Sequence, residues 1–132
     1  MTIAEETQFA KEELEALFSS VRWESAKYHD RLVRAMRGFS CVLSAREEGR
    51  LVGLLAAMDD GEMTAYIHYL LVAPEAQGRG VGSRLLQAAL ARYRGYTRVV
   101  LHTDGEGVQA FYRKHGFSPP DSVCMGLTPR SQ

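Results

Sequence analysis

The sequence predicts an α/β (α+β) fold in which helices cover the faces of a mixed sheet. Three observations predict it: the order of the expected elements, a length of 132 residues and a hydrophobic content of 45%. Strand-like segments come first and a strand–helix–strand–helix–strand series follows, an order typical of a mixed sheet with helices on its faces. The length corresponds to about one domain, and no linker or repeat divides the chain. We therefore expect a single domain over residues 1–132.

Two helices are expected in the first forty residues, after a short strand over Thr2–Glu5. From Ala10 onward the apolar residues recur at the spacing of one helical face. Ser25 is placed to cap the second helix, and Gly38 is placed to end it.

Three strands are expected next, over Phe39–Ala45, Leu51–Met58 and Ala65–Val72. Asp59-Asp60-Gly61 is typical of a hairpin turn between the last two. The segment Ala65–Val72 is almost continuously apolar, so we expect it in the centre of the sheet with both faces covered. The remaining elements are a helix from Val81 that stops at Gly95, a strand over Thr97–His102, a short helix over Val108–His115 closed by Gly116, and a last strand over Ser122–Leu127.

Composition excludes several classes of function. Sixteen basic and sixteen acidic side chains cancel, which argues against a nucleic-acid partner, because such domains are usually strongly basic. No apolar run approaches the roughly 20 residues of a membrane span, and the first residues lack the pattern of a signal peptide. Cys41 and Cys124 lie in apolar, strand-like segments and are expected as buried, reduced thiols. The four histidines show no metal-ligand spacing. We expect a cytoplasmic protein with no membrane partner and no metal.

Charge is nevertheless uneven along the chain. Residues 1–20 carry five acids and one base, and residues 77–98 carry five arginines and no acid. We expect most of these side chains on solvated helix faces. The arginines, however, surround a glycine-rich turn, where local positive potential attracts anionic ligands.

That turn, Gln77–Ser83, lies between a predicted strand and a predicted helix. Its three glycines let a ligand approach the main chain closely, and the first N–H groups of the following helix point into the turn. These features favour phosphate binding, to which Arg79 and Ser83 could add side-chain contacts. A Walker loop requires a lysine that is absent here, and the spacing Gly78-x-Gly80-x-Gly82 is not that of a dinucleotide site. The structural alternative is an ordinary tight turn.

Two motifs in the chain resemble a known family. The segment LLVAPEAQGRGVGSRLL (70–86), followed after one strand by AFYRKHGF (110–117), resembles the GNAT superfamily of acyl-CoA-dependent N-acyltransferases over roughly residues 40–127. The resemblance implies a mostly antiparallel mixed sheet with helices on both faces. It also implies that the strand at 65–72 and the strand at 97–102 splay apart.

The resemblance implies acetyl-CoA as the cofactor. Its diphosphate would bind the backbone N–H groups of Gln77 to Ser83, and its pantetheine arm would pair with Leu70–Val72 like an extra strand. No particular arginine is singled out for the ribose phosphate of CoA. The residues expected to bind the cofactor are Leu70, Leu71, Val72, Gln77, Gly78, Arg79, Gly80, Val81, Gly82, Ser83 and Phe111.

Tyr112 is the expected catalytic acid. It stands four residues before Gly116, as does the tyrosine that protonates the departing thiolate in many GNAT enzymes. A phenol is neutral at pH 7, which is the state required of an acid. Without the resemblance, an ordinary aromatic side chain in the helix would be the preferred interpretation. The N–H of Val72 is the expected donor to the developing oxyanion.

His68 is the expected general base. An unperturbed imidazole titrates near pH 6.5, close to ideal for taking a proton from an amine. The arylalkylamine N-acetyltransferase branch of the superfamily carries two histidines at alternate positions on this strand. They match Tyr66 and His68, so this chain has a histidine at the second position only. A side-chain period of two puts Tyr66, His68 and Leu70 on one face. A satisfied core or interface histidine is an equally good interpretation.

Three other side chains have two interpretations each. Trp23 either lines the acceptor pocket or anchors the first two helices. Asp104 and Glu106 follow the strand at 97–102, where they could attract a cationic amine, although a solvated loop is the simpler interpretation.

The leading hypothesis is an N-acetyltransferase that moves acetyl from acetyl-CoA to a primary amine of a small molecule. The alternatives are a protein or peptide N-acetyltransferase, a non-catalytic acyl-CoA-binding regulatory module, and a protein that binds another phosphate ligand. Dimers are frequent in the family, so a homodimer is a further expectation, with the last strand contributing to its contact.

Overall fold

The computed structural model describes residues 1–103 and 105–129. Contacts divide the chain into two compact units, Met1–His102 and Thr103–Gln132. Each unit is described by itself. Within the described residues, every helix is too short or too polar to span a membrane.

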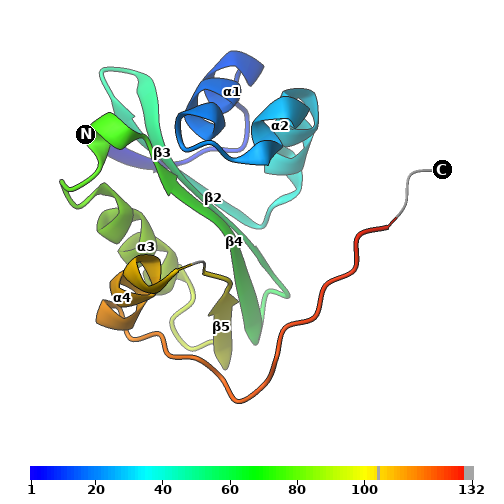
Figure 1. Cartoon of the computed structure of the whole chain (residues 1–132). Helices are drawn as coiled ribbons and strands as arrows, with labels where there is room; N and C mark the ends of the chain where they lie inside the picture. Colours follow the sequence, from blue (N-terminus) through cyan, green and yellow to red (C-terminus); the bar gives the residue numbers. More distant parts are fainter. Residues whose placement is uncertain (104, 130–132) are drawn as a thin grey trace. The chain divides into compact units, whose positions relative to one another are not determined.

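The first unit is built on a mixed sheet with the strand order β1-β2-β3-β4-β5, counted over the described residues (Figure 1). The strands are β1 (Thr2–Glu5), β2 (Cys41–Glu47), β3 (Arg50–Asp59), β4 (Thr64–Val72) and β5 (Arg98–Leu101). The first four strands pair antiparallel, whereas β4 and β5 are parallel. The predicted mixed, mostly antiparallel sheet is therefore confirmed.

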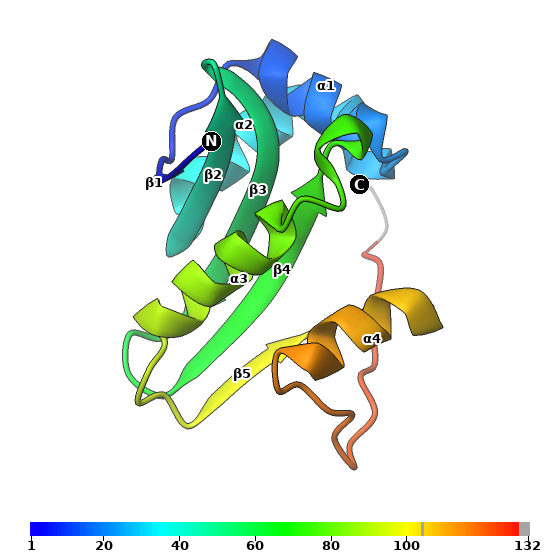
Figure 2. The same ribbon diagram turned by 90° about the vertical axis from the view of Figure 1, so that its left-hand side faces the viewer.

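Helices cover both faces of this sheet (Figure 2). Helices α1 (Lys11–Ser20) and α2 (His29–Gly38) lie on one face, and α3 (Val81–Arg92) lies on the other. The core under α1 and α2 joins the two helices to the sheet through Leu14, Leu17, Phe18, Leu32, Met36, Val42, Leu54, Ala56 and Leu71. On the α3 side, Leu85, Leu86 and Ala89 are buried.

The second helix begins later than Ser25 suggested. A short 3₁₀ helix, η1 (Glu24–Tyr28), precedes α2, and Tyr28 is the N-cap residue without a side-chain hydrogen bond. The Ser25 hydroxyl instead lies 3.3 Å from the Tyr69 hydroxyl of β4. The predicted cap is therefore wrong, because η1 lies between Ser25 and the start of α2, and the Ser25 hydroxyl pairs with a side chain of the sheet.

Gly53 of β3 allows α3 to approach the sheet closely. A Cβ atom at this position would lie only 3.1 Å from the side chains of both Val81 and Leu85. Real Cβ contacts are rarely so short, so a larger residue would push the first turns of α3 outward. Gly53 therefore helps to hold the start of α3, and the turn before it, against the end of β4.

The second unit contains α4 (Glu106–Lys114). Gly116 ends this helix with φ of +95°, a conformation that favours glycine. The N–H of Phe117 then donates to the carbonyl of Tyr112 at 3.1 Å. The predicted helix at 108–115 is thus confirmed to within two residues at each end.

The predicted last strand at Ser122–Leu127 is wrong. Residues 118–129 form no strand in the structure as described, and Val123, Met125 and Leu127 are 85–90% exposed. Alternating apolar residues form a strand only when a neighbouring strand pairs with them, and no strand of the described residues pairs with this segment. Cys124 in this segment is exposed, contrary to expectation, whereas Cys41 in β2 is buried as predicted.

Two acidic side chains near the start of the chain form ion pairs within the fold. Arg46 of β2 donates to Glu6 through Nε and Nη2, both at 2.9 Å, and to Glu13 through Nη1 at 2.8 Å. All three side chains are mostly buried. The expectation of a solvated face is therefore wrong for Glu6 and Glu13, because a basic residue more than 30 positions away meets them across β1 and α1.

Replacing Arg46 with methionine is expected to lower the free energy of unfolding at pH 7 by about 2–3 kcal/mol, because charged hydrogen bonds are lost and two carboxylates remain. Arg46 holds the pKa of Glu6 and of Glu13 below the ordinary value of 4.5. Their stabilisation is therefore present above pH 4.5 and is lost as the pH falls through the lowered values. Urea unfolding of both proteins at pH 7 and at lower pH measures this.

Arg50→Met is the matched control, since its ion pair with Glu75 is exposed and should contribute less than about 1 kcal/mol. If Arg46→Met and the unchanged protein lost stability in parallel on acidification, the ion cluster would not be the source of the pH dependence.

Candidate active site

The turn between β4 and α3 has the geometry of an anion-binding site. Gly78 and Gly80 have φ near +80°, and Gly80 is the left-handed N-cap residue of α3. The first intrahelical bond is donated by Arg84 to the Gly80 carbonyl, so the N–H groups of 81–83 precede the helical hydrogen-bond ladder. The first turn contains no acidic residue. The turn therefore fits a diphosphate, which needs aligned N–H donors and no opposing carboxylate.

Two of the five arginines near this turn already have acidic partners. Arg79 forms an ion pair with Glu47 of β2, and Arg92 donates to Glu5 at 2.8 Å. Both arginines are thus paired with acidic residues of the sheet, which reduces the positive potential around the glycine turn. Ser83 in the first turn of α3 is half-buried.

Strand β4 contains a β-bulge at His68. Tyr69 is opposite Ala56 and Ile67 is opposite Ala57, so His68 is an extra residue with no partner in this register. A bulge bends the strand and reverses the alternation of side chains beyond it. Because paired residues share a face, Leu70 lies with Leu55 on the α3 side, whereas Tyr69 lies with Ala56 in the core under α1 and α2.

The bulge corrects two expectations about this strand. Tyr66 and His68 share a face, as predicted, since their rings are 5.5 Å apart, but Leu70 does not. Nor are both faces fully covered: His68 is exposed, and Tyr66 and Leu70 are half-buried. Leu70 departs from the predicted face because a period of two holds only while the strand is regular.

Beyond the bulge, β4 separates from β5. The parallel ladder runs from Thr64 opposite Arg98 to Ile67 opposite Leu101, and continues no further in the described residues. Ala73 donates to Val52 of β3 at 2.8 Å. Since hydrogen-bonded pairs alternate along an antiparallel ladder, the backbone groups of Val72 and Leu70 point the other way, into the opening. The predicted splay is confirmed, and it leaves an edge of β4 that pairs with no other strand of the described residues, beside the glycine turn.

His68 is held within a cluster of aromatic rings. Its Nδ1 lies 3.0 Å from the Tyr66 hydroxyl, Phe39 stacks on it with ring centroids 6.0 Å apart, and Tyr69 meets it edge-on at 4.4 Å. Partial burial lowers the pKa of His68, and the nearby His102 lowers it further. The neutral imidazole, which accepts a proton, is therefore the favoured form at pH 7.

Tyr112 belongs to the second unit. It is buried and packs edge-on against Phe111 at 5.1 Å and Phe117 at 5.8 Å. Burial raises the pKa of its phenol above the ordinary value of 10, so the hydroxyl keeps its proton throughout the neutral range. Glu106 lies in the first turn of the same helix, and Asp104 lies outside the described residues.

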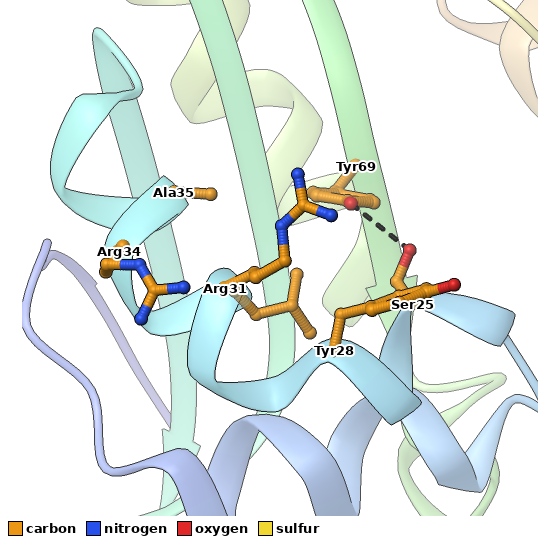
Figure 3. Close-up of a pocket in the computed structure, with 7 residues that line it drawn as sticks. Ser25, Tyr28, Arg31, Arg34, Ala35 and Tyr69 are labelled. Atoms are coloured by element: carbon orange, nitrogen blue, oxygen red, sulfur yellow. Dashed lines mark hydrogen bonds between the residues drawn. The ribbon is translucent and has the colours of Figure 1, made fainter. Parts of the chain in front are cut away.

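A pocket of about 500 Å³ opens between the start of α2 and β4 (Figure 3). Ser25 and Tyr28 of η1, Arg31 and Arg34 of α2, and Tyr69 of β4 line it. Sequence reasoning did not single out the two arginines, although their spacing of three on a predicted helix places them on one side. Trp23 does not line this pocket and packs edge-on against Phe18 at 5.9 Å.

Comparison with known proteins identifies the family. The model of the acetyltransferase (GNAT) family matches residues 6–117. The chain belongs to the GNAT acetyltransferase family. The resemblance found in the glycine turn and the tyrosine motif is therefore confirmed.

Relatives of this GNAT chain carry different acetyltransferase names. The N-alpha-acetyltransferase RimI of Mycobacterium tuberculosis is 29% identical over 121 residues, which cover 89% of this chain and 75% of that protein. A mycothiol acetyltransferase of Beutenbergia cavernae is 45% identical over 60 residues, which cover 42% of this chain but only 20% of the enzyme. A GNAT acetyltransferase structure from Streptococcus pneumoniae has a TM-score of 0.85, 27% identity and 98% coverage of both chains.

Proposed function

We propose that this GNAT chain transfers the acetyl group of acetyl-CoA to a primary amine of a small molecule. The observation that carries the proposal is the open edge of β4 directly before the anion-binding turn. A strand edge whose outward backbone groups pair with no neighbouring strand suits the amide-containing pantetheine arm, and the N–H groups at the start of α3 suit the diphosphate.

The residues proposed to hold the cofactor lie in two adjoining segments. Leu70 and Val72 direct backbone groups into the opening, and the Gln77 side chain donates to the Val72 carbonyl at 2.9 Å, which ties the turn to the strand end. Residues 78–83 would bind the phosphates through backbone N–H groups. Phe111, on the second unit, is proposed to contact the cofactor by family resemblance alone.

Acetyl-CoA supplies a thioester whose carbonyl carbon is open to attack by an amine. In the transfer the C–N bond forms and the C–S bond breaks. We assign the proton lost by the amine to His68 and the proton gained by the thiolate to Tyr112, and the Val72 N–H would donate to the acetyl oxygen. When His68 Nδ1–H donates to the Tyr66 oxygen, Nε2 carries the lone pair that accepts the proton.

The direct test is release of free thiol from acetyl-CoA in the presence of primary amines, with the acetylated product identified by mass spectrometry. A panel of small amines and of peptides with free N-termini separates the two candidate acceptor classes. The peptide class is the second candidate, because the RimI relative aligns with most of this chain. Binding of acetyl-CoA without turnover of any amine would favour a non-catalytic acyl-CoA-binding module instead.

In this assay His68→Gln is expected to lower kcat/KM by about 100-fold. In the unchanged protein, kcat/KM should fall on acidification through a pKa below 6.5, since protonated His68 cannot accept a proton. His102→Gln is a control for the direction of this effect. Removing His102 should raise the pKa of His68, so the fall of kcat/KM on acidification should begin at a higher pH. The value of kcat/KM at higher pH should stay the same. If His68→Gln kept both the rate and the fall on acidification, His68 would not be the base.

The compartment that we propose for this reaction is the cytoplasm. The buried thiol of Cys41, whose pKa is raised by burial, suits a reducing compartment.

A further inference from the structure

The pocket beside Tyr69 carries two positive charges on one wall. Arg31 and Arg34 are three residues apart in α2 and both line it. Side chains with this spacing are neighbours on a helix surface, about 5–6 Å apart at Cβ. Figure 3 shows both extending from α2, with Tyr69 and Ser25 joined by their hydrogen bond in the same pocket. Each guanidinium adds to the positive potential of this wall, which favours an anionic ligand.

The neighbouring acids do not supply that anion. Asp30 lies 4.0 Å from Lys11, Glu24 lies 2.7 Å from Lys27, and Glu15 lies 3.6 Å from His29. Across the described residues, no carboxylate lies within ion-pair distance of Arg31 or Arg34. Arg31 instead lies over the Tyr28 ring at 5.8 Å. The acids around this helix are therefore engaged elsewhere, and the charge of the pocket is left for a ligand.

The pocket adjoins the proposed base. Tyr69 lines it, and the ring of Tyr69 meets His68 at 4.4 Å. A molecule bound in the pocket would thus lie next to the residue that takes the amine proton. The volume of about 500 Å³ is within the range of small-molecule sites, and the tyrosine rings offer apolar contact area beside the charges.

We propose that the acceptor carries an anionic group, a carboxylate or a phosphate, which Arg31 and Arg34 bind while its amine is directed toward His68. That the bound molecule is an acetyl acceptor rests on the proposed function, whereas the anion site itself is inferred from the pocket alone. Guanidinium groups bind both oxyanions through paired N–H donors. The substrate class is therefore an amine whose charge is balanced by an acidic group, in preference to a simple cationic amine.

Binding without turnover tests the anion site. The probes are 3-phenylpropionate, phenyl phosphate and the uncharged 3-phenylpropanamide. Trp23 is the single tryptophan and lies 6.0 Å from Tyr69 between ring centroids, so its fluorescence reports on the pocket. We expect the anions to bind about 10- to 100-fold more tightly than the amide, and Arg31→Gln or Arg34→Gln to remove that preference. Which anion binds more tightly distinguishes carboxylate from phosphate.

Arg37→Gln is the matched control, because Arg37 is an exposed arginine of the same helix that does not line the pocket. It should leave the anion preference unchanged. The proposal is overturned if neither anion binds, if the amide binds equally well, or if Arg37→Gln weakens binding as much as the pocket variants do.

Acetyl transfer provides the second measurement. Amino acids are compared with the amines that lack only their carboxylate, such as phenylalanine with phenethylamine. We expect higher kcat/KM for the amino acids. Arg31→Gln or Arg34→Gln should raise KM for the amino acids by about tenfold or more, and should leave kcat, and KM for the amines without a carboxylate, unchanged. Anion binding without turnover of any amine would contradict the proposed function and support the anion site. Turnover with no preference for amino acids would support the proposed function and contradict the anion site.

Discussion

Gly80→Asp is expected to weaken acetyl-CoA binding by about 100-fold or more. Gly80 is the left-handed N-cap residue of α3, and the new carboxylate would stand where the diphosphate is proposed to bind. Two unit charges about 4 Å apart repel by about 4 kcal/mol at an effective dielectric constant of 20. Calorimetric titration with acetyl-CoA measures the loss.

Gly80→Asn is the control for shape and backbone strain. A Cβ at Gly80 meets nothing within 4 Å, and Asn and Asp both tolerate the left-handed conformation better than other side chains do. Both also serve as N-cap residues, so α3 should remain folded. We therefore expect Asn to change affinity by much less than Asp. Equal affinities for the Asp and Asn variants would show that the diphosphate binds elsewhere.

Tyr112→Phe is expected to reduce kcat by 10²- to 10⁴-fold, the usual contribution of a general acid. The change removes one oxygen and keeps the edge-on packing with Phe111 and Phe117. Because burial raises the pKa of Tyr112 above 10, the phenol should stay protonated and kcat should not decline through neutral pH in the unchanged protein. Single-turnover kinetics with acetyl-CoA and a good amine measure the chemical step.

Tyr93→Phe is the matched control for the loss of a buried tyrosine hydroxyl. Tyr93 is also buried, and its hydroxyl donates to Asp59 at 2.8 Å. It is the C-cap residue of α3 and has no proposed catalytic role. The substitution should cost stability and leave kcat near the original value. If Tyr112→Phe kept full kcat while acetyl-CoA still bound, thiolate protonation would have to come from another group.

Local sequence patterns were sufficient for most elements and for the family. The apolar spacing from Ala10, the glycine at 38 and the hairpin at 59–61 act through neighbours a few residues away, so the sequence alone predicts them. The glycine turn is of the same kind: the conformations of Gly78 and Gly80 and the free N–H groups of α3 follow from residues adjacent in the chain. The tyrosine motif and this turn together were specific enough to indicate the GNAT family.

Long-range contacts decided the rest. The bulge at His68 depends on the register between β3 and β4, and no residue type in β4 predicts it. Arg46 meets Glu6 and Glu13 only after β1 and α1 pack beside β2. In the same way, Ser25 lost its predicted capping role to Tyr69, and the segment at 122–127 stayed without a strand. The sequence by itself determined most of the elements, the glycine turn and the family, because these depend on short-range geometry. Only the tertiary structure decided which side chains share the pocket beside His68, because strand register and helix packing join residues that are far apart in the chain.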